Sequence, residues 1–165
     1  MRTVRLLRGP LSLSVLVALA ACAPTTPPAR APEQTQAKAP PACVPARAGD
    51  PVVGNWLSVT SEKGLAGSLR TLYTLNANGT MNYVEQVKRP RAPSQGLYEA
   101  GCWTHESQTV VLRTLQSNGV PVDLNDPIYI NRYRVSQATA TELRMLGPNG
   151  AVRLRRMSPG YRLPF

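Results

Sequence analysis

The sequence predicts an all-β domain, a small antiparallel meander barrel of about eight strands, and three observations predict it. Short β-rich runs recur at intervals of about 8 to 15 residues, as in small barrels. Turn residues such as Asn78-Gly79 separate neighbouring runs. No segment keeps a helical period over about 11 residues.

The elements follow in order from local pattern. The run 68–75 alternates, with Leu69, Tyr73 and Leu75 on one face, and Asn78-Gly79 then predicts a hairpin into 80–88. A Pro-bearing loop precedes the pair 96–104 and 108–115, and a polar connection leads to 128–135. The expected strands are 52–60, 68–75, 80–88, 96–104, 108–115, 128–135, 141–146 and 151–157.

The last hairpin turns at 147–150, and in its second strand Val152 and Leu154 face one way while Arg153 and Arg155 face the other. A closed barrel would leave no strand edge exposed.

A family resemblance rests on motifs in this order: Gly54-x-Trp56, Asn78-Gly79-Thr80, Gly101-x-Trp103 and a closing hairpin over 143–150. Together they resemble the lipocalin-like barrels of envelope lipoproteins, notably the N-terminal domain of the NlpE family of copper-resistance and envelope-stress lipoproteins. The resemblance covers most of 52–157 and implies a fold and a compartment. The family's C-x-x-C pair is missing from 60–64, so no copper or redox role and no cofactor is implied.

The N-terminus predicts export and lipidation. Three arginines precede an apolar run at 11–21 that is too short to span a bilayer, and residues 1–21 therefore resemble a signal peptide. Leu19-Ala20-Ala21-Cys22 resembles the lipobox of bacterial lipoproteins, in which Cys22 would carry the lipid. The alternative is an ordinary signal peptide with a chance Cys. Ala23 favours the outer membrane, on its periplasmic face.

Residues 22–49 are expected to be a tether. Pro and Ala dominate the segment, which lacks the apolar surface to offset the entropy of ordering. Pro-rich chains extend by about 3.1 Å per residue, so 22–41 would reach roughly 60 Å; a tail of no mechanical importance is the alternative. Residues 50–165 then form the single barrel domain.

Cysteine usage predicts a disulfide. With Cys22 lipidated, Cys43 and Cys102 remain, and an even remainder in an oxidising compartment favours a bond between them. The alternative is that Cys43, in a Pro-rich stretch, lies too far away. His105 is expected to be an ordinary strand-end residue, and the spacing predicts no metal site.

The charge predicts an anionic partner. Removing the three signal arginines from 19 basic residues leaves 16 against 9 acidic ones, a net charge of +7. Export argues against nucleic acid and favours anionic lipid headgroups, lipopolysaccharide phosphates or an acidic envelope protein. The alternative is an ordinary solvated surface. The expected basic patch comprises Arg132, Arg134, Arg153, Arg155 and Arg156.

No catalytic pattern is present, so we expect a binding or scaffolding lipoprotein and not an enzyme. Alternatives are an inhibitor of a host enzyme, or a carrier of an apolar ligand. Aromatic side chains would fill the core or line a cavity, and core filling is favoured because eight-stranded barrels are narrow. These aromatic residues are Trp56, Tyr73, Tyr83, Trp103, Tyr129 and Tyr133.

Overall fold

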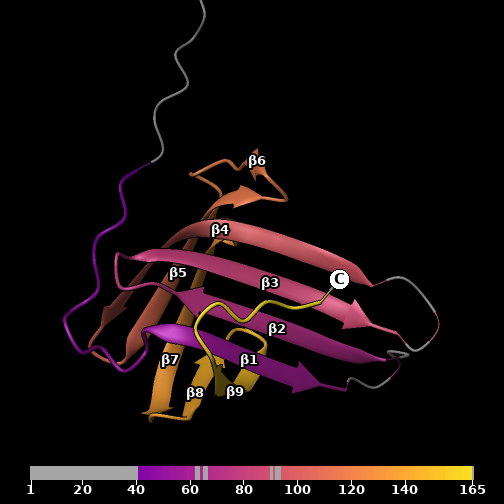
Figure 1. The fold of residues 1–165 in the computed structure, drawn as a ribbon. Coiled ribbons are helices and arrows are strands. Elements are labelled where there is room, and N and C mark those ends of the chain that lie inside the picture. The colour runs from indigo at the N-terminus through magenta and orange to yellow at the C-terminus, as the bar shows by residue number, and fades with distance from the viewer. Residues whose placement is uncertain (1–40, 62–63, 65–66, 90, 92–93, 165) are drawn as a thin grey trace, which may run out of the picture. The chain divides into compact units, whose positions relative to one another are not determined.

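The computed structural model describes residues 41–61, 64, 67–89, 91 and 94–164, and these form a closed antiparallel barrel of eight strands (Figure 1). The expected signal peptide, Cys22 and the tether as far as residue 40 lie outside the described residues. The strands are β1 (Gly54–Thr60), β2 (Ser68–Leu75), β3 (Thr80–Lys88), β4 (Gln95–Glu106), β5 (Thr109–Ser117), β7 (Ile130–Ala138), β8 (Glu142–Gly147) and β9 (Gly150–Met157). The predicted all-β meander barrel is confirmed.

Neighbouring strands in the chain are neighbours in the barrel, and β9 closes it by pairing with β1. This closing pair is short, with three residue pairs from Asn55↔Met157 to Leu57↔Arg155. The connection between β5 and β7 adds the two-residue strand β6 (Val120–Pro121) and the 3-10 turn η1 (Pro127–Tyr129). Neither short element was predicted.

Both predicted hairpins form where the turn chemistry places them. Gly79 has a φ of +82° in the β2–β3 turn, and its amide donates to the Asn76 carbonyl. The β8–β9 hairpin pairs Gly147 with Gly150 around Pro148 and Asn149. Local turn residues therefore fix the register of these strands.

Alternation along the strands sends one set of apolar side chains into the barrel. Trp56 and Trp103 are fully buried there, and their indole N–H groups donate to the carbonyls of Val52 and Asn76. The remaining buried members of this interior cluster are Val52, Tyr73, Leu75, Met81, Val110, Leu112, Leu143, Met145 and Leu154. The two indoles behave as packed core groups, each with its polar atom satisfied.

One end of the barrel is closed by residues 41–53, here called the N-terminal segment. The predicted disulfide is present: Cys43 and Cys102 are bonded, with Cα atoms 5.2 Å apart. The Ala46 amide donates to the Ala77 carbonyl, and a Cβ on Gly79 would collide with the Val44 carbonyl. The described end of the expected tether therefore contacts the barrel.

The C-terminal segment, residues 158–164, crosses the outer face of β1, β2 and β3 (Figure 1). Leu163 packs there against Leu57 and Leu72, and the buried Gln86 amide donates to the Pro164 carbonyl at 2.7 Å. This second apolar cluster lies outside the barrel wall. Within the described part of the chain, no helix has the length and hydropathy of a bilayer-spanning segment.

Candidate functional site

The barrel end opposite the N-terminal segment is hollow and polar. Two adjoining cavities of about 220 and 180 Å³ lie there, sharing Tyr83, Asn131, Tyr133 and Asn149 in their walls. We call them together the mouth cavity. Its other lining residues are Ser58, Thr60, Leu69, Thr71, Tyr73, Met81, Glu85, Leu97, Glu99, Leu112, Thr114, Gly147, Pro148, Gly150, Ala151 and Val152.

Strand alternation positions the polar groups of the mouth cavity. On β3, Tyr83 and Glu85 share the inward face with the core residue Met81, two residues apart each time. On β4, Glu99 shares that face with Trp103, and on β5 Thr114 shares it with Leu112. The strands thus carry apolar residues at the closed end and polar residues at the mouth.

The two carboxylates of the cavity already accept hydrogen bonds from hydroxyl groups. The Tyr83 hydroxyl donates to Glu85 at 2.6 Å, and the Thr114 hydroxyl donates to Glu99 at 3.1 Å. Tyr83 lies opposite Glu99, and Glu85 lies opposite Leu97. The glutamates are therefore diagonal cross-strand neighbours, with backbone positions about 7 to 8 Å apart.

Burial shapes the protonation of these groups. It raises the pKa of Glu99, a shift that Glu85 increases and the Thr114 hydrogen bond opposes. Burial is also the main cause that raises the pKa of Tyr73, Tyr83 and Tyr133. The three phenols therefore stay protonated at neutral pH and act as hydrogen-bonding groups.

The tyrosines form a connected wall. Tyr73 meets Tyr83 edge to face with ring centroids 5.1 Å apart, and meets Tyr133 in the same manner at 6.1 Å. A Cβ on Gly147 would collide with the Tyr133 ring, so the glycine leaves room for it. This wall, with the carboxylates, suits binding of a small polar ligand. Among the described residues, no group of three His, Cys, Asp or Glu side chains is placed to hold a metal ion.

The outer surface of β5, β7, β8 and β9 is strongly basic, and we call it the arginine face. On β7, Arg132 and Arg134 are exposed and alternate with the inward Asn131 and Tyr133. Glu142 is the only acidic residue in these four strands. The face comprises Arg113, Arg132, Arg134, Arg144, Arg153 and Arg155.

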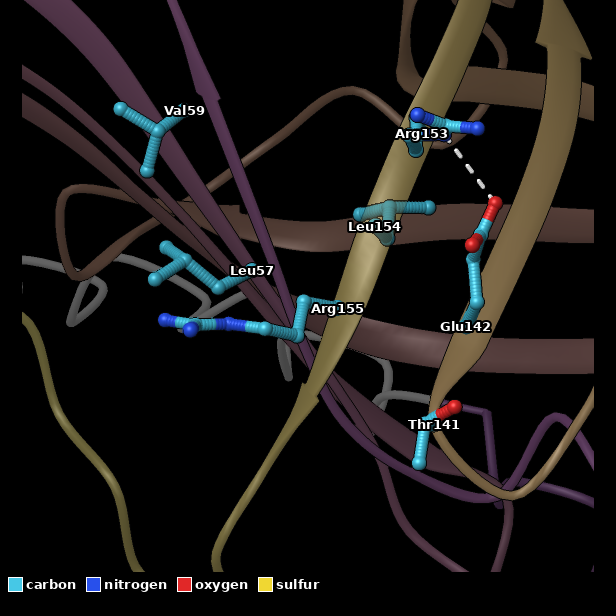
Figure 2. Close-up of a pocket in the computed structure, with 7 residues that line it drawn as sticks. All are labelled: Leu57, Val59, Thr141, Glu142, Arg153, Leu154 and Arg155. Atoms are coloured by element: carbon cyan, nitrogen blue, oxygen red, sulfur yellow. Dashed lines mark hydrogen bonds and ion pairs between the residues drawn. The ribbon is translucent and has the colours of Figure 1, made fainter.

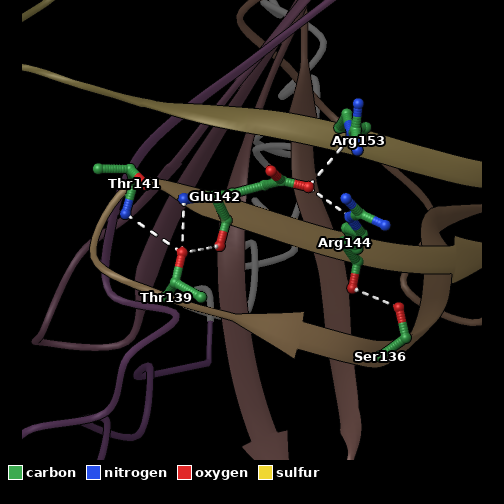
Figure 3. Close-up of polar contacts among 6 residues, drawn as sticks. All are labelled: Ser136, Thr139, Thr141, Glu142, Arg144 and Arg153. Carbon is green, nitrogen blue, oxygen red and sulfur yellow. Dashed lines mark hydrogen bonds and ion pairs between the residues drawn. The ribbon is translucent and has the colours of Figure 1, made fainter.

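Glu142 ties two of these arginines together. Its Oε1 accepts from Nε of Arg144 and, at 3.1 Å, from Nε of Arg153 (Figure 3). These hydrogen bonds, chiefly that of Arg144, lower the pKa of the Glu142 carboxyl. Thr139 caps the same corner, since its hydroxyl accepts from the amides of Thr141 and Glu142 (Figure 3).

A groove of about 530 Å³ lies at the seam between β1 and β9, beyond their short pairing (Figure 2). Leu57 and Val59 line it from β1, and Val59 is exposed. Arg153 and Arg155 line it from β9, with Glu142 already paired to Arg153. The groove mixes apolar and charged side chains, and its one carboxylate, that of Glu142, is already paired with Arg153. The groove therefore offers less hydrogen-bonding specificity than the mouth cavity.

His105 has a partner that the sequence did not reveal. Its Nδ1 lies 2.9 Å from Oδ2 of Asp50, and the side chains are 15% and 6% exposed. Asp50 also accepts from the Val52 amide. Ser107 lines the surface cavity beside the pair, and among the described residues the hydrogen-bond partner of His105 is Asp50. The pair therefore fastens the N-terminal segment to β4.

The remaining predicted site residues lie in different parts of the molecule. Of the six aromatic candidates, only Tyr73, Tyr83 and Tyr133 line the mouth cavity, and Tyr129 lies in η1. Four of the five predicted patch arginines lie on the arginine face. Arg156 lies elsewhere, with its guanidinium 4.0 Å from the Trp56 ring and donating to the Val53 and Pro51 carbonyls.

The carboxylates of the mouth cavity were missed, although the sequence carried a signal for them. Glu85 falls two residues after Tyr83, and Glu99 falls four before Trp103, so each shares the parity of an aromatic residue predicted to face inward. Charged residues at inward positions of a barrel strand mark a hollow region.

No protein-family model matches this chain, and a search of curated proteins finds no significant relative.

Proposed function

We propose that this chain is a lipid-anchored lipoprotein of a bacterial cell envelope whose barrel is a non-enzymatic binding module. The observation that carries the binding role is the asymmetry of the barrel. One end is closed by the N-terminal segment and packed with apolar side chains, while the other holds a polar cavity. Preformed cavities with a few convergent polar groups are typical of ligand sites.

The disulfide supports the compartment. Disulfides persist in the periplasm and are rare in the bacterial cytosol, and Cys43–Cys102 joins the N-terminal segment to β4. Together with the lipobox at 19–22, this bond favours an exported protein held on the periplasmic face of the outer membrane. The resemblance to the NlpE domain supports the same placement.

Binding is favoured over catalysis by the state of the polar groups. The three phenols stay protonated, and both carboxylates accept hydroxyl hydrogen bonds from neighbouring side chains. The polar lining also argues against the apolar-ligand carrier. A lysozyme-type inhibitor is disfavoured because a basic enzyme would be repelled by the arginine face.

Lipidation is tested by labelling cells with an alkyne-tagged palmitate and comparing the wild type with Cys22→Ser. The wild type is expected to carry the label and to sediment with membranes. The variant is expected to lose the label and to stop sedimenting with membranes in high salt, which screens contacts between exposed charges and anionic lipid. A variant that still carries the label at wild-type level would contradict the anchor.

Binding at the mouth is tested by photo-crosslinking in cells. A photoreactive residue at Tyr133 is expected to give an adduct in intact-mass spectra. The same residue at the exposed Leu146 of β8 serves as the matched control. Equal adducts from both positions, or none from Tyr133, would contradict a binding role for the mouth.

A second role, contact with anionic lipid, is favoured by the arginine face. Each basic residue near an anionic membrane contributes about 1 kcal/mol of attraction. The Cys22→Ser chain is expected to sediment with phosphatidylglycerol vesicles but not phosphatidylcholine vesicles. Replacing Arg132, Arg134 and Arg153 by Gln should abolish this difference. Equal sedimentation with both vesicle types would contradict the contact.

A further inference from the structure

The mouth cavity has a charge opposite to that of the protein around it. Glu85 and Glu99 line it, and none of its described lining residues is Arg, Lys or His. The chain as a whole carries a formal net charge of +10. The basic residues of β7 point outward while Asn131 and Tyr133 point inward. A ligand that enters this cavity therefore meets two carboxylates with no described cationic side chain among them.

Two residues with hydroxyl groups line the same cavity. Ser58 and Thr71 lie opposite each other on β1 and β2, and both line the larger cavity. As residues they are 5% and 8% exposed. A hydroxyl group can both donate and accept a hydrogen bond. Ser58 and Thr71 therefore suit a ligand that carries hydrogen-bonding groups of its own.

The tyrosine wall adds a surface that attracts cations. Tyr73, Tyr83 and Tyr133 present aromatic rings around the two carboxylates. Aromatic faces attract ammonium groups, most strongly where water is excluded. Phenolic hydroxyls and the Asn131 amide supply both donors and acceptors for hydroxyl groups.

We propose that the mouth cavity binds a small hydroxylated primary amine, such as an amino sugar, as its ammonium ion. The ammonium group lies between Glu85 and Glu99 beside the tyrosine rings, and the ligand hydroxyls bond to Ser58 and Thr71. This inference rests on the proposed binding role and names its ligand class. Cavities of about 220 and 180 Å³ lie below the range of drug-sized pockets, about 300 to 1,000 Å³, and suit a single small ring.

The test is calorimetric titration of the full chain in a neutral detergent, so that the result does not depend on lipidation. Glucosamine is the probe, and glucose is the matched neutral ligand with the same ring. Glucosamine is expected to bind at least about tenfold more tightly, a difference of about 1.4 kcal/mol. Equal affinity for the two sugars, or no binding of glucosamine, would overturn the proposal.

Variants locate the binding. Glu85→Gln and Glu99→Gln keep side-chain carbonyls for the Tyr83 and Thr114 hydroxyls, and each is expected to weaken glucosamine binding at least about tenfold. Glu142→Gln on the arginine face is the matched control and should bind as the wild type does. Unchanged affinity in both cavity variants, or displacement of glucosamine by millimolar Ca²⁺, would also overturn the proposal. If only the lipid anchor is wrong, palmitate labelling of the wild type is absent while glucosamine binding is retained.

Discussion

The two ends of the barrel are built from the same strands but from opposite kinds of side chain. At the closed end, Trp56 and Trp103 are fully buried and their N–H groups are satisfied. At the mouth, the same strands β1 and β4 carry Ser58 and Glu99, which face a cavity. The closed end therefore holds most of the packing that stabilises the fold.

The contrast extends to the connections. The N-terminal segment is fastened at the closed end by a disulfide, a backbone hydrogen bond and the Asp50–His105 pair. The mouth keeps two carboxylates, those of Glu85 and Glu99, close together in a partly buried cavity. Binding sites often retain such destabilising arrangements because the ligand needs them. Stability and binding should thus respond to different substitutions.

The largest expected effect on stability comes from the closed end. Trp56→Ala removes a fully buried indole, its hydrogen bond to Val52 and its contact with Arg156. We expect the free energy of unfolding to fall by about 3 to 5 kcal/mol in urea titrations. Tyr83→Phe at the mouth is the comparison and should cost less. A smaller loss for Trp56→Ala than for Tyr83→Phe would break the distinction between the ends.

The disulfide should have the next largest effect. Cys43 and Cys102 are 59 residues apart, and opening a loop of that size costs roughly 4 kcal/mol on the chain-entropy model. Urea unfolding of the Cys43→Ala/Cys102→Ala variant measures this loss. Ligand binding at the mouth should stay within about twofold of wild type. Unchanged stability would show that the bond does not hold the N-terminal segment.

At the mouth, removing charge should not destabilise the protein. Glu99→Gln keeps an acceptor for Thr114 and removes a partly buried charge that repels Glu85. Its free energy of unfolding at neutral pH should be unchanged or up to about 1 kcal/mol higher, after allowance for solvent screening. Urea unfolding measures it. A clear loss of stability would mean that the carboxylate is structural.

The dependence of stability on pH sharpens the same point. The pKa of Glu99 is raised in the folded protein above its unfolded value of about 4.3. Between the two pKa values the folded state binds more protons, so this group makes stability fall as pH rises through that window. The groups around Glu99 are Glu85, Tyr83, Thr114 and Tyr133.

Unfolding curves from about pH 4 to 7, for wild type and Glu99→Gln, isolate this contribution. As pH rises, the free energy of unfolding of the wild type should fall relative to that of the variant, and the difference should then level off. A difference of opposite slope would contradict the raised pKa.

The smallest effect is expected on the arginine face. Glu142 lies at the surface with its side chain 30% exposed, and its lowered pKa reflects hydrogen bonds to Arg144 and Arg153. Surface ion pairs contribute little, so Glu142→Gln should leave the urea midpoint at neutral pH unchanged. A large shift would show that the pairing of β8 with β9 depends on this carboxylate.

Local pattern predicted the strands and hairpins because alternation and turn chemistry are local. The expected run 80–88 is β3, and Gly147–Gly150 is the predicted turn. The Asp50–His105 pair and the packing of Leu163 on β1 and β2 join distant parts of the chain. Such contacts depend on how the barrel closes, which no short window encodes.

The candidate site was predicted in part. Tyr73, Tyr83 and Tyr133 were identified as possible cavity residues, whereas Glu85 and Glu99 were not. Arg156 shares the inward parity of Leu154, and alternation alone would have removed it from the basic patch. These errors arose where residue type was weighed above position on the strand.

The division between a stabilising end and a binding end is tested most directly with Glu85→Gln/Glu99→Gln. Its urea midpoint and its heat of glucosamine binding are measured on the same preparation. We predict a midpoint equal to or above that of wild type together with loss of binding. A lower midpoint with wild-type binding would contradict the account.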